Sequence, residues 1–193
     1  MNYTDRIEEL IRRQRKYASF FEWFRKEKSI KEAGVVKSLI ESMMKHNSPG
    51  YRNIRASNAD PPDCYAETLD GALVGFEVRE LVDQEAVELN ERGKEVYRDW
   101  TTPEIVQELQ RIIEEKDSKN YVGGPYEKLI LVIPTAEPVI TDRQLRPVLE
   151  SHEFHQTKQL HEAYLLFQYD PETQTSPYIQ LRFATKKALQ PTS

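Results

Sequence analysis

Two acidic residues lie in a stretch of the chain that otherwise has the pattern of a β-hairpin. Asp63 stands at its start, and Glu77 stands in the middle of an apolar strand. The pair Asp70-Gly71 predicts the turn between the two strands, because both residue types tolerate positive φ. A carboxylate inside an apolar strand is costly to bury unless something compensates its charge. The sequence therefore predicts either a divalent metal ion or a salt bridge at Glu77.

Two helices each carry an ionisable side chain on the face that should be buried. At about 100° per residue, Glu32 falls on the apolar face of a helix predicted over 30–46. Lys116 falls in the middle of the apolar stripe of a helix predicted over 103–116. Each has an ordinary alternative. Glu32 could be a capped or paired acid in the first turn, where the helix dipole favours it, and Lys116 could extend its ammonium group to solvent.

Taken together, Glu32, Asp63, Glu77 and Lys116 are predicted to face inward from separate elements. Clusters of this kind form metal sites and active sites. Two or three carboxylates suit a hard cation such as Mg²⁺ or Mn²⁺. Such an ion polarises a phosphoryl oxygen and lowers the pKa of a bound water, while a nearby lysine stabilises developing negative charge.

The elements that must position these residues alternate between helices and strands. We expect an amphipathic helix over 3–28, a helix capped by Ser29, strands at 51–58, 63–69 and 72–82, a helix-prone stretch over 84–99, a helix with Pro103 at its first position, a strand at 126–134, a short helix from Thr141 to about 151, and a strand pair at 163–169 and 178–183. This order indicates an α/β sandwich with a mixed sheet. We expect one domain over 1–193, with its core at about 30–134 and additions over 135–193.

The composition excludes several classes of protein. Of the 193 residues, 38% are hydrophobic and 31% charged, and no apolar run reaches the ~18–20 residues of a membrane span. The single cysteine, Cys64, excludes an internal disulfide and a thiolate zinc site, and it fits a reducing cytoplasm. The net charge of −5 is uneven, because residues 1–58 carry 13 Lys and Arg against 7 Asp and Glu. A basic N-terminal third could follow a phosphate backbone or could be a solvated helical face.

The hairpin residues carry a family resemblance. Asp60-Pro61-Pro62-Asp63, followed after the turn by Glu77-Val78-Arg79, resembles the motif of the PD-(D/E)XK nuclease superfamily, in a bacterial branch. The resemblance covers roughly residues 30–134. It implies a restriction-endonuclease-like αβββαβ core and a Mg²⁺- or Mn²⁺-dependent endonuclease that hydrolyses DNA phosphodiester bonds.

The resemblance also implies roles for individual residues. Asp63 and Glu77 would be metal ligands, the carbonyl of Val78 would complete the metal shell, and Glu32 would match an acid that many members place on the first core helix. Arg79 stands where the pattern has lysine; it stays protonated and cannot act as a base, although it could hold a phosphate. Some members supply the lysine from the following helix, where Lys116 is placed.

Two further hypotheses remain open. The chain could have a nuclease-like fold without catalysis that binds protein or nucleic acid, with Glu77 and Arg79 as a structural ion pair. It could also be a homodimeric interaction module, because the aromatic-rich segment 20–24 has apolar surface to cover.

Overall fold

The computed structural model describes residues 28–48, 50–57, 61–94, 96, 98–137 and 139–185. The elements follow one another as α2 (Lys28–Lys45), β1 (Arg52–Ala56), β2 (Cys64–Glu67), β3 (Leu73–Val78), α3 (Gln84–Glu91), α4 (Thr102–Asp117), β4 (Lys128–Pro134), α5 (Asp142–Leu149), β5 (Glu153–Phe154), β6 (Glu162–Leu166) and β7 (Tyr178–Phe183). Nearly all of the expected helix over 3–28 and the whole aromatic segment 20–24 lie outside the described residues.

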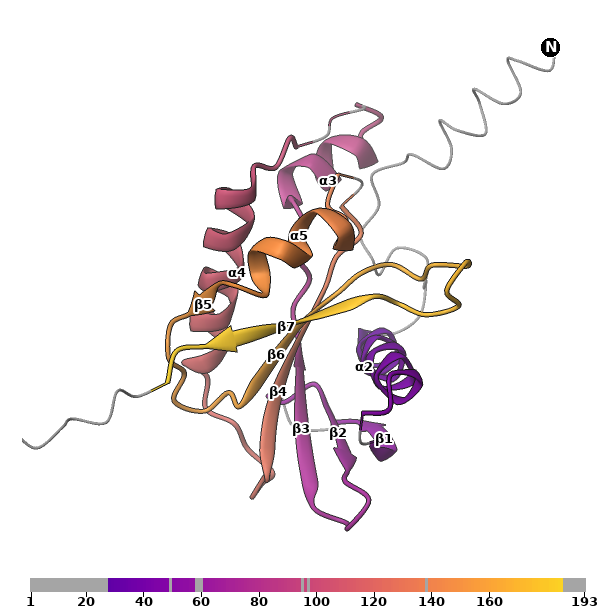
Figure 1. Ribbon diagram of the computed structural model, residues 1–193, viewed down its shortest axis with the longest axis vertical. Coiled ribbons are helices and arrows are strands. Elements are labelled where there is room, and N and C mark those ends of the chain that lie inside the picture. The colour runs from indigo at the N-terminus through magenta and orange to yellow at the C-terminus, as the bar shows by residue number, and fades with distance from the viewer. Residues whose placement is uncertain are drawn as a thin grey trace, which may run out of the picture.

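Seven strands form one mixed sheet in the order β1-β2-β3-β4-β6-β7-β5. The strands β1, β2 and β3 pair antiparallel, whereas β3, β4 and β6 run parallel. The strand β7 returns antiparallel to β6, and β5 is parallel to β7. Figure 1 shows α2 on one face of the sheet and α3, α4 and α5 on the other. The expected α/β architecture, a mixed central sheet flanked by helices, is confirmed.

The two faces of the sheet carry separate apolar cores, because side chains alternate along each strand. On one face Phe76 belongs to the same core as Leu39 of α2. On the other face Leu131 belongs to the same core as Leu109 of α4. Glu77 follows Phe76 in β3, and its side chain therefore points away from the α2 core and toward α4.

The hairpin that precedes the site forms as its turn residues predict. Gly71 has φ of 95°, a left-handed conformation that glycine adopts without a steric penalty. The amide of Thr68 donates to the carbonyl of Ala72 at 2.9 Å, which closes the turn. The pairing of Cys64 with Phe76 then places Asp63 one step beyond, opposite Glu77.

Helix ends agree with the sequence in two places and differ in a third. Thr141 caps α5 as expected, because its hydroxyl accepts the amide of Gln144 at 3.3 Å. Before α4, the Glu104 carboxylate accepts the amide and the hydroxyl of Thr101, and the helix begins at Thr102, one residue earlier than predicted. The expectation that Ser29 is an N-cap is wrong, because Ser29 lies inside α2. Serine lowers helix stability only slightly, so a helix can continue through it.

Two element boundaries and one short strand differ from those predicted from the sequence. The strand expected over 72–82 ends at Val78, and the pairing resumes only as an isolated bridge between Leu81 and Thr135. The helix-prone stretch over 84–99 forms a helix only to Glu91, since Gly93 at φ 79° ends it. The strand β5 was not expected, because two residues are too short for a periodic pattern. Within the described ranges, no helix combines the length and the apolar character that crossing a membrane requires.

We expect Phe76→Ala to lower the free energy of unfolding by about 3–5 kcal/mol, because it leaves a cavity in the core between β3 and α2. Phe76 is fully buried. Urea denaturation followed by circular dichroism measures the change. The control is Leu69→Ala in the same hairpin, where the side chain is 67% exposed and the expected change is within about 0.5 kcal/mol. Equal losses in the two variants would contradict this assignment of the core.

Candidate functional site

Glu77 is a fully buried carboxylate that two lysines contact. One carboxylate oxygen, Oε1, lies 2.5 Å from Nζ of Lys116 and 2.9 Å from Nζ of Lys119. The other oxygen, Oε2, is buried and has no hydrogen-bond partner among the described residues. The expected salt bridge at Glu77 is therefore present. Its partners are the two lysines and not Arg79, so the hypothesis of a Glu77–Arg79 pair is wrong.

Lys116 reaches Glu77 from the last turn of α4. It is only 6% exposed, and burial lowers the pKa of its ammonium group from the ordinary value. The inward direction predicted from helical phase is correct. The alternative that the ammonium group extends to solvent is wrong, because a carboxylate inside the protein already pairs with it.

Asp63 lies directly before β2 and links the hairpin to α2. Its Oδ2 accepts the amide of Val78 at 2.8 Å, and its Oδ1 lies 3.9 Å from Nζ of Lys28. Burial and the neighbouring Glu77 carboxylate both raise the pKa of Asp63. Asp63 therefore lies among charges that come from three separate elements.

Glu32 is the acid that α2 contributes. It is 6% exposed, and Lys28 lies one turn earlier with its Nζ 3.4 Å from Oε1. Burial and then the nearby Asp63 carboxylate raise the pKa of Glu32 to about 7. The predicted inward direction is correct. The alternative of a paired acid is also confirmed, because Lys28 contacts Glu32, although Glu32 lies beyond the first turn of α2.

Glu32, Asp63, Lys116 and Lys119 line one cavity of about 450 Å³, and Glu77 is buried behind the two lysines that contact it. Arg79 is exposed and lines it as well, whereas the side chain of Val78 is buried at its edge. The residues that line the cavity are Lys28, Glu32, Asp63, Val78, Arg79, Glu80, Val82, Gln84, Glu108, Arg111, Lys116 and Lys119. Charged groups dominate this list, which suits a charged ligand rather than an apolar one.

The sequence reasoning missed two lysines of this site. Lys28 stands four residues before Glu32, and this i,i+4 spacing is a signal that could have identified the pair. Lys119 follows the end of α4, so helical phase gives no direction for it. Only the path of the chain after the helix brings its ammonium group to Glu77.

The carboxylates lie close together, as the ligands of a hard cation do, but they do not form a complete metal-binding group. The Asp63 carboxylate raises the pKa of Glu32, and the Glu77 carboxylate raises that of Asp63, each after the larger effect of burial. Oε2 of Glu77 lacks a hydrogen-bond partner among the described residues. In the same part of the chain, no group of three or more His, Cys, Asp and Glu residues is arranged to hold a metal ion. An ion such as Mg²⁺ needs only one or two carboxylates, because water completes its shell. The acids that line the cavity and could contribute to such a site are Glu32 and Asp63.

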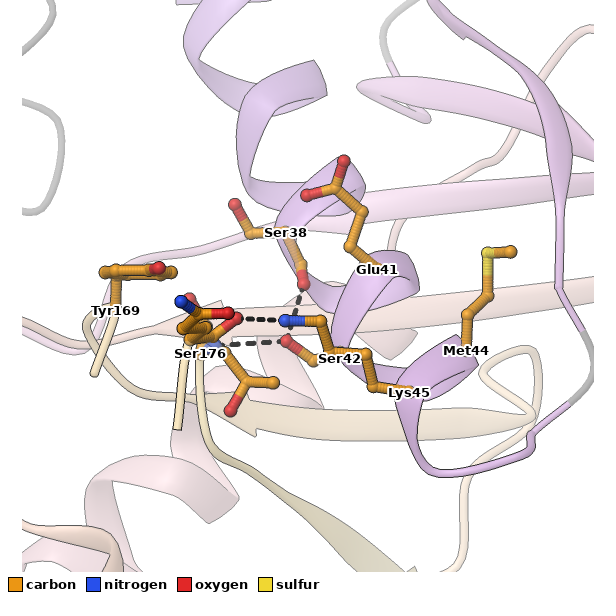
Figure 2. Close-up of a pocket in the computed structure, with 9 residues that line it drawn as sticks. Ser38, Glu41, Ser42, Met44, Lys45, Tyr169 and Ser176 are labelled. Atoms are coloured by element: carbon orange, nitrogen blue, oxygen red, sulfur yellow. Dashed lines mark hydrogen bonds between the residues drawn. The ribbon is translucent and has the colours of Figure 1, made fainter. Parts of the chain in front are cut away.

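A second cavity, of about 400 Å³, lies between α2 and the loop that joins β6 to β7. Figure 2 shows Ser42 between Ser38 and Ser176: its hydroxyl donates to the carbonyl of Ser38 at 2.9 Å and accepts the amide of Ser176 at 3.1 Å. Lys45 binds the carbonyl of Gln174 in the same loop. These bonds join the loop to the helix, and the cavity holds no cluster of acids like that at Glu77.

Comparison of the chain with protein-family models, with curated proteins and with solved structures finds no match.

The raised pKa of Glu32 predicts a pH-dependent stability. Its pKa is about 7 in the folded protein and 4.5 ordinarily, so between these values the folded state binds more protons than the unfolded chain. Stability should then fall as pH rises through this window. In metal-free buffer, we expect Glu32→Gln to reduce the loss between about pH 5 and about pH 8 by roughly 1–3 kcal/mol.

Urea denaturation across this pH range measures the slope for each protein. Glu41→Gln is the control, because Glu41 is an exposed acid on the same helix. Some slope should remain in the Glu32 variant, since the pKa of Asp63 is also raised. A Glu32→Gln protein with the wild-type slope would show that Glu32 does not hold this proton.

Proposed function

We propose that this chain is a metal-dependent phosphodiesterase that hydrolyses DNA. The observation that carries the proposal is the meeting of Glu32, Asp63 and Glu77 with Lys116 and Lys119 beside one charged cavity. Burying three acids is costly, and a globular domain needs no such cluster for its stability. Perturbed ionisable groups that gather in a cleft are typical of active sites.

The order of elements supports a nuclease-like core. The succession of α2, β1, β2, β3, α4 and β4 corresponds to the αβββαβ order of the restriction-endonuclease-like fold, with α3 inserted before α4. Asp63 and Glu77 occupy the hairpin positions that the PD-(D/E)XK motif reserves for its acids. We take this correspondence as support for the proposal.

Asp63 and Glu77 would hold Mg²⁺ or Mn²⁺, with the carbonyl of Val78 as a further ligand. The two lysines contact Oε1 of Glu77, and Oε2, which is buried without a hydrogen-bond partner among the described residues, would be the oxygen that binds the cation. When bound, the ion would polarise the phosphoryl group and lower the pKa of a water molecule.

The cationic side chains would act on the phosphate. Lys116 and Lys119 pair with the buried Glu77, and Lys119, whose side chain is 33% exposed and lines the cavity, can also reach a ligand there. Arg79 lines the same cavity and would hold a phosphate through its fork of N–H donors. Lys116 of α4 and Lys119, just after this helix, would therefore take the role that the motif gives to a lysine at position 79.

Glu32 would move a proton near neutral pH. A carboxyl group with a pKa of about 7 is protonated and deprotonated in comparable amounts there, which is the condition for general acid–base catalysis. Lys28 beside it favours the charged form. Glu32 could thus accept a proton from water as the phosphodiester bond is attacked.

One observation favours a second function, a nuclease-like module that binds without catalysis. Both lysines already compensate Glu77, so the fold does not require a metal ion to bury this carboxylate. In that case the cavity would serve only to recognise a charged partner. Metal binding separates the two functions directly.

We expect the wild-type protein to bind Mn²⁺ in isothermal titration calorimetry and to cleave DNA when Mg²⁺ or Mn²⁺ is supplied. Asp63→Asn should abolish the binding and lower the cleavage rate by at least about 100-fold, because an amide is a poorer ligand than a carboxylate for a hard cation. The amide oxygen can still accept the Val78 amide, so the fold should survive.

Asp70→Asn in the turn of the same hairpin is the matched control, because this acid is exposed and lies outside the cavity. It should bind metal and cleave DNA like the wild type. An absence of heat at millimolar Mn²⁺ in the wild type would refute the phosphodiesterase and support the binding module. Equal cleavage by the Asp63→Asn and wild-type proteins would refute the assigned site.

A further inference from the structure

The end of α4, which carries the lysines of the site, is attached to the segment that leads into β6. The side-chain amide of Gln159 donates two hydrogen bonds there. One goes to the carbonyl of Asp117 at 2.7 Å, and the other goes to the carbonyl of Lys119 at 2.6 Å. A single side chain thus holds two carbonyls of the backbone from which the lysines extend.

The Asp117 side chain completes this attachment in the opposite direction. Its carboxylate accepts the backbone amides of Lys158, Gln159 and Leu160 at 2.8–3.1 Å. Leu160 is 4% exposed and belongs to the core on the α4 face. The segment that holds the helix end is therefore itself anchored in the core.

The same segment is also attached to the sheet. His161 donates its amide to the carbonyl of Leu129 at 2.9 Å, and its Nδ1 accepts the amide of Leu129 at 3.1 Å. Leu129 lies in β4, which pairs with β3. A continuous path of hydrogen bonds therefore runs from the sheet that carries Glu77 to the helix end that carries its lysines.

A fixed helix end matters because of the residues it presents. The last carbonyls of a helix lack partners within the helix and must find them elsewhere. Here Gln159 binds those of Asp117 and Lys119, while the hydroxyl of Tyr121 donates to that of Lys116 at 2.9 Å. Lysine side chains have many rotamers, so two ammonium groups reach one carboxylate oxygen only when their backbone is held in place.

We infer that Gln159 is a positioning residue, which holds the end of α4 so that Lys119 and Lys116 both contact Glu77. It does not line the cavity and touches no group that a substrate would reach. Its effect on the lysine contacts follows from the geometry alone. Its effect on catalysis rests on the proposed phosphodiesterase function.

The test compares the lysine ammonium groups in wild-type, Gln159→Ala and Gln159→Met proteins by ¹H–¹⁵N NMR. A buried, hydrogen-bonded ammonium group exchanges its protons slowly with water and gives a resolved signal, and a Lys119→Met protein identifies the signal of Lys119. We expect this signal to be lost or shifted in both Gln159 variants. The methionine variant keeps about the length of the side chain and removes the amide group that donates the two hydrogen bonds.

Gln110→Ala is the matched control. Gln110 also joins α4 to the segment before β6, because its Oε1 accepts the amide of His155 at 2.9 Å, but it lies away from the helix end. This variant should keep the Lys119 signal. Unchanged lysine signals in both Gln159 variants would overturn the inference, as would an equal loss in Gln110→Ala, which would indicate a general loosening of the segment.

DNA cleavage gives a second readout. If the wild type cleaves DNA, Gln159→Ala should lower kcat on the order of 10-fold to 100-fold while KM stays within about twofold, because misplaced charges lose transition-state stabilisation rather than binding. If the wild type does not cleave DNA, the proposed function fails but the NMR comparison still decides the role of Gln159.

Discussion

The buried carboxylate of Glu77 is the constraint on which the site depends. A charge on a strand between two apolar layers must be compensated where it lies, since the backbone cannot move it to water. Lys116 and Lys119 provide the compensation from the end of α4. The end of α4 must therefore pack on the sheet in a position from which its lysines reach Glu77. The hydrogen bonds from Gln159 to the carbonyls of Asp117 and Lys119 hold the helix end there.

Regular elements made part of this site predictable from the sequence. Glu32 and Lys116 lie inside helices, where about 100° per residue gives the direction of a side chain, and Glu77 lies inside a strand with a period of two. These two periodicities predict that the three side chains are buried. Lys119 lies beyond the end of α4, and the segment around Gln159 contacts that end from some 40 residues further along the chain. No local periodicity carries such long-range contacts, so the structure was needed to find them.

The charges of the site come in matched numbers. Three acids, Glu32, Asp63 and Glu77, face three lysines, Lys28, Lys116 and Lys119. This balance lets the cluster exist without a metal ion, yet the pairing is uneven. Two lysines share one oxygen of Glu77, whereas Lys28 alone pairs with both Glu32 and Asp63. Burial raises the pKa of both of these acids, and the Asp63 carboxylate raises that of Glu32 further.

Arg79 lines the cavity but does not pair with Glu77. A lysine there would extend from an exposed position of the hairpin, two residues after Glu77 and on the same side of the strand. In this chain arginine occupies that position and lines the cavity, while Glu77 takes its cations from α4. Arginine binds phosphate oxygens well through its planar fork but cannot release a proton. Under the proposed function, recognition of phosphate by Arg79 would be separated from compensation of Glu77, and the acid whose pKa lies near neutral pH is Glu32.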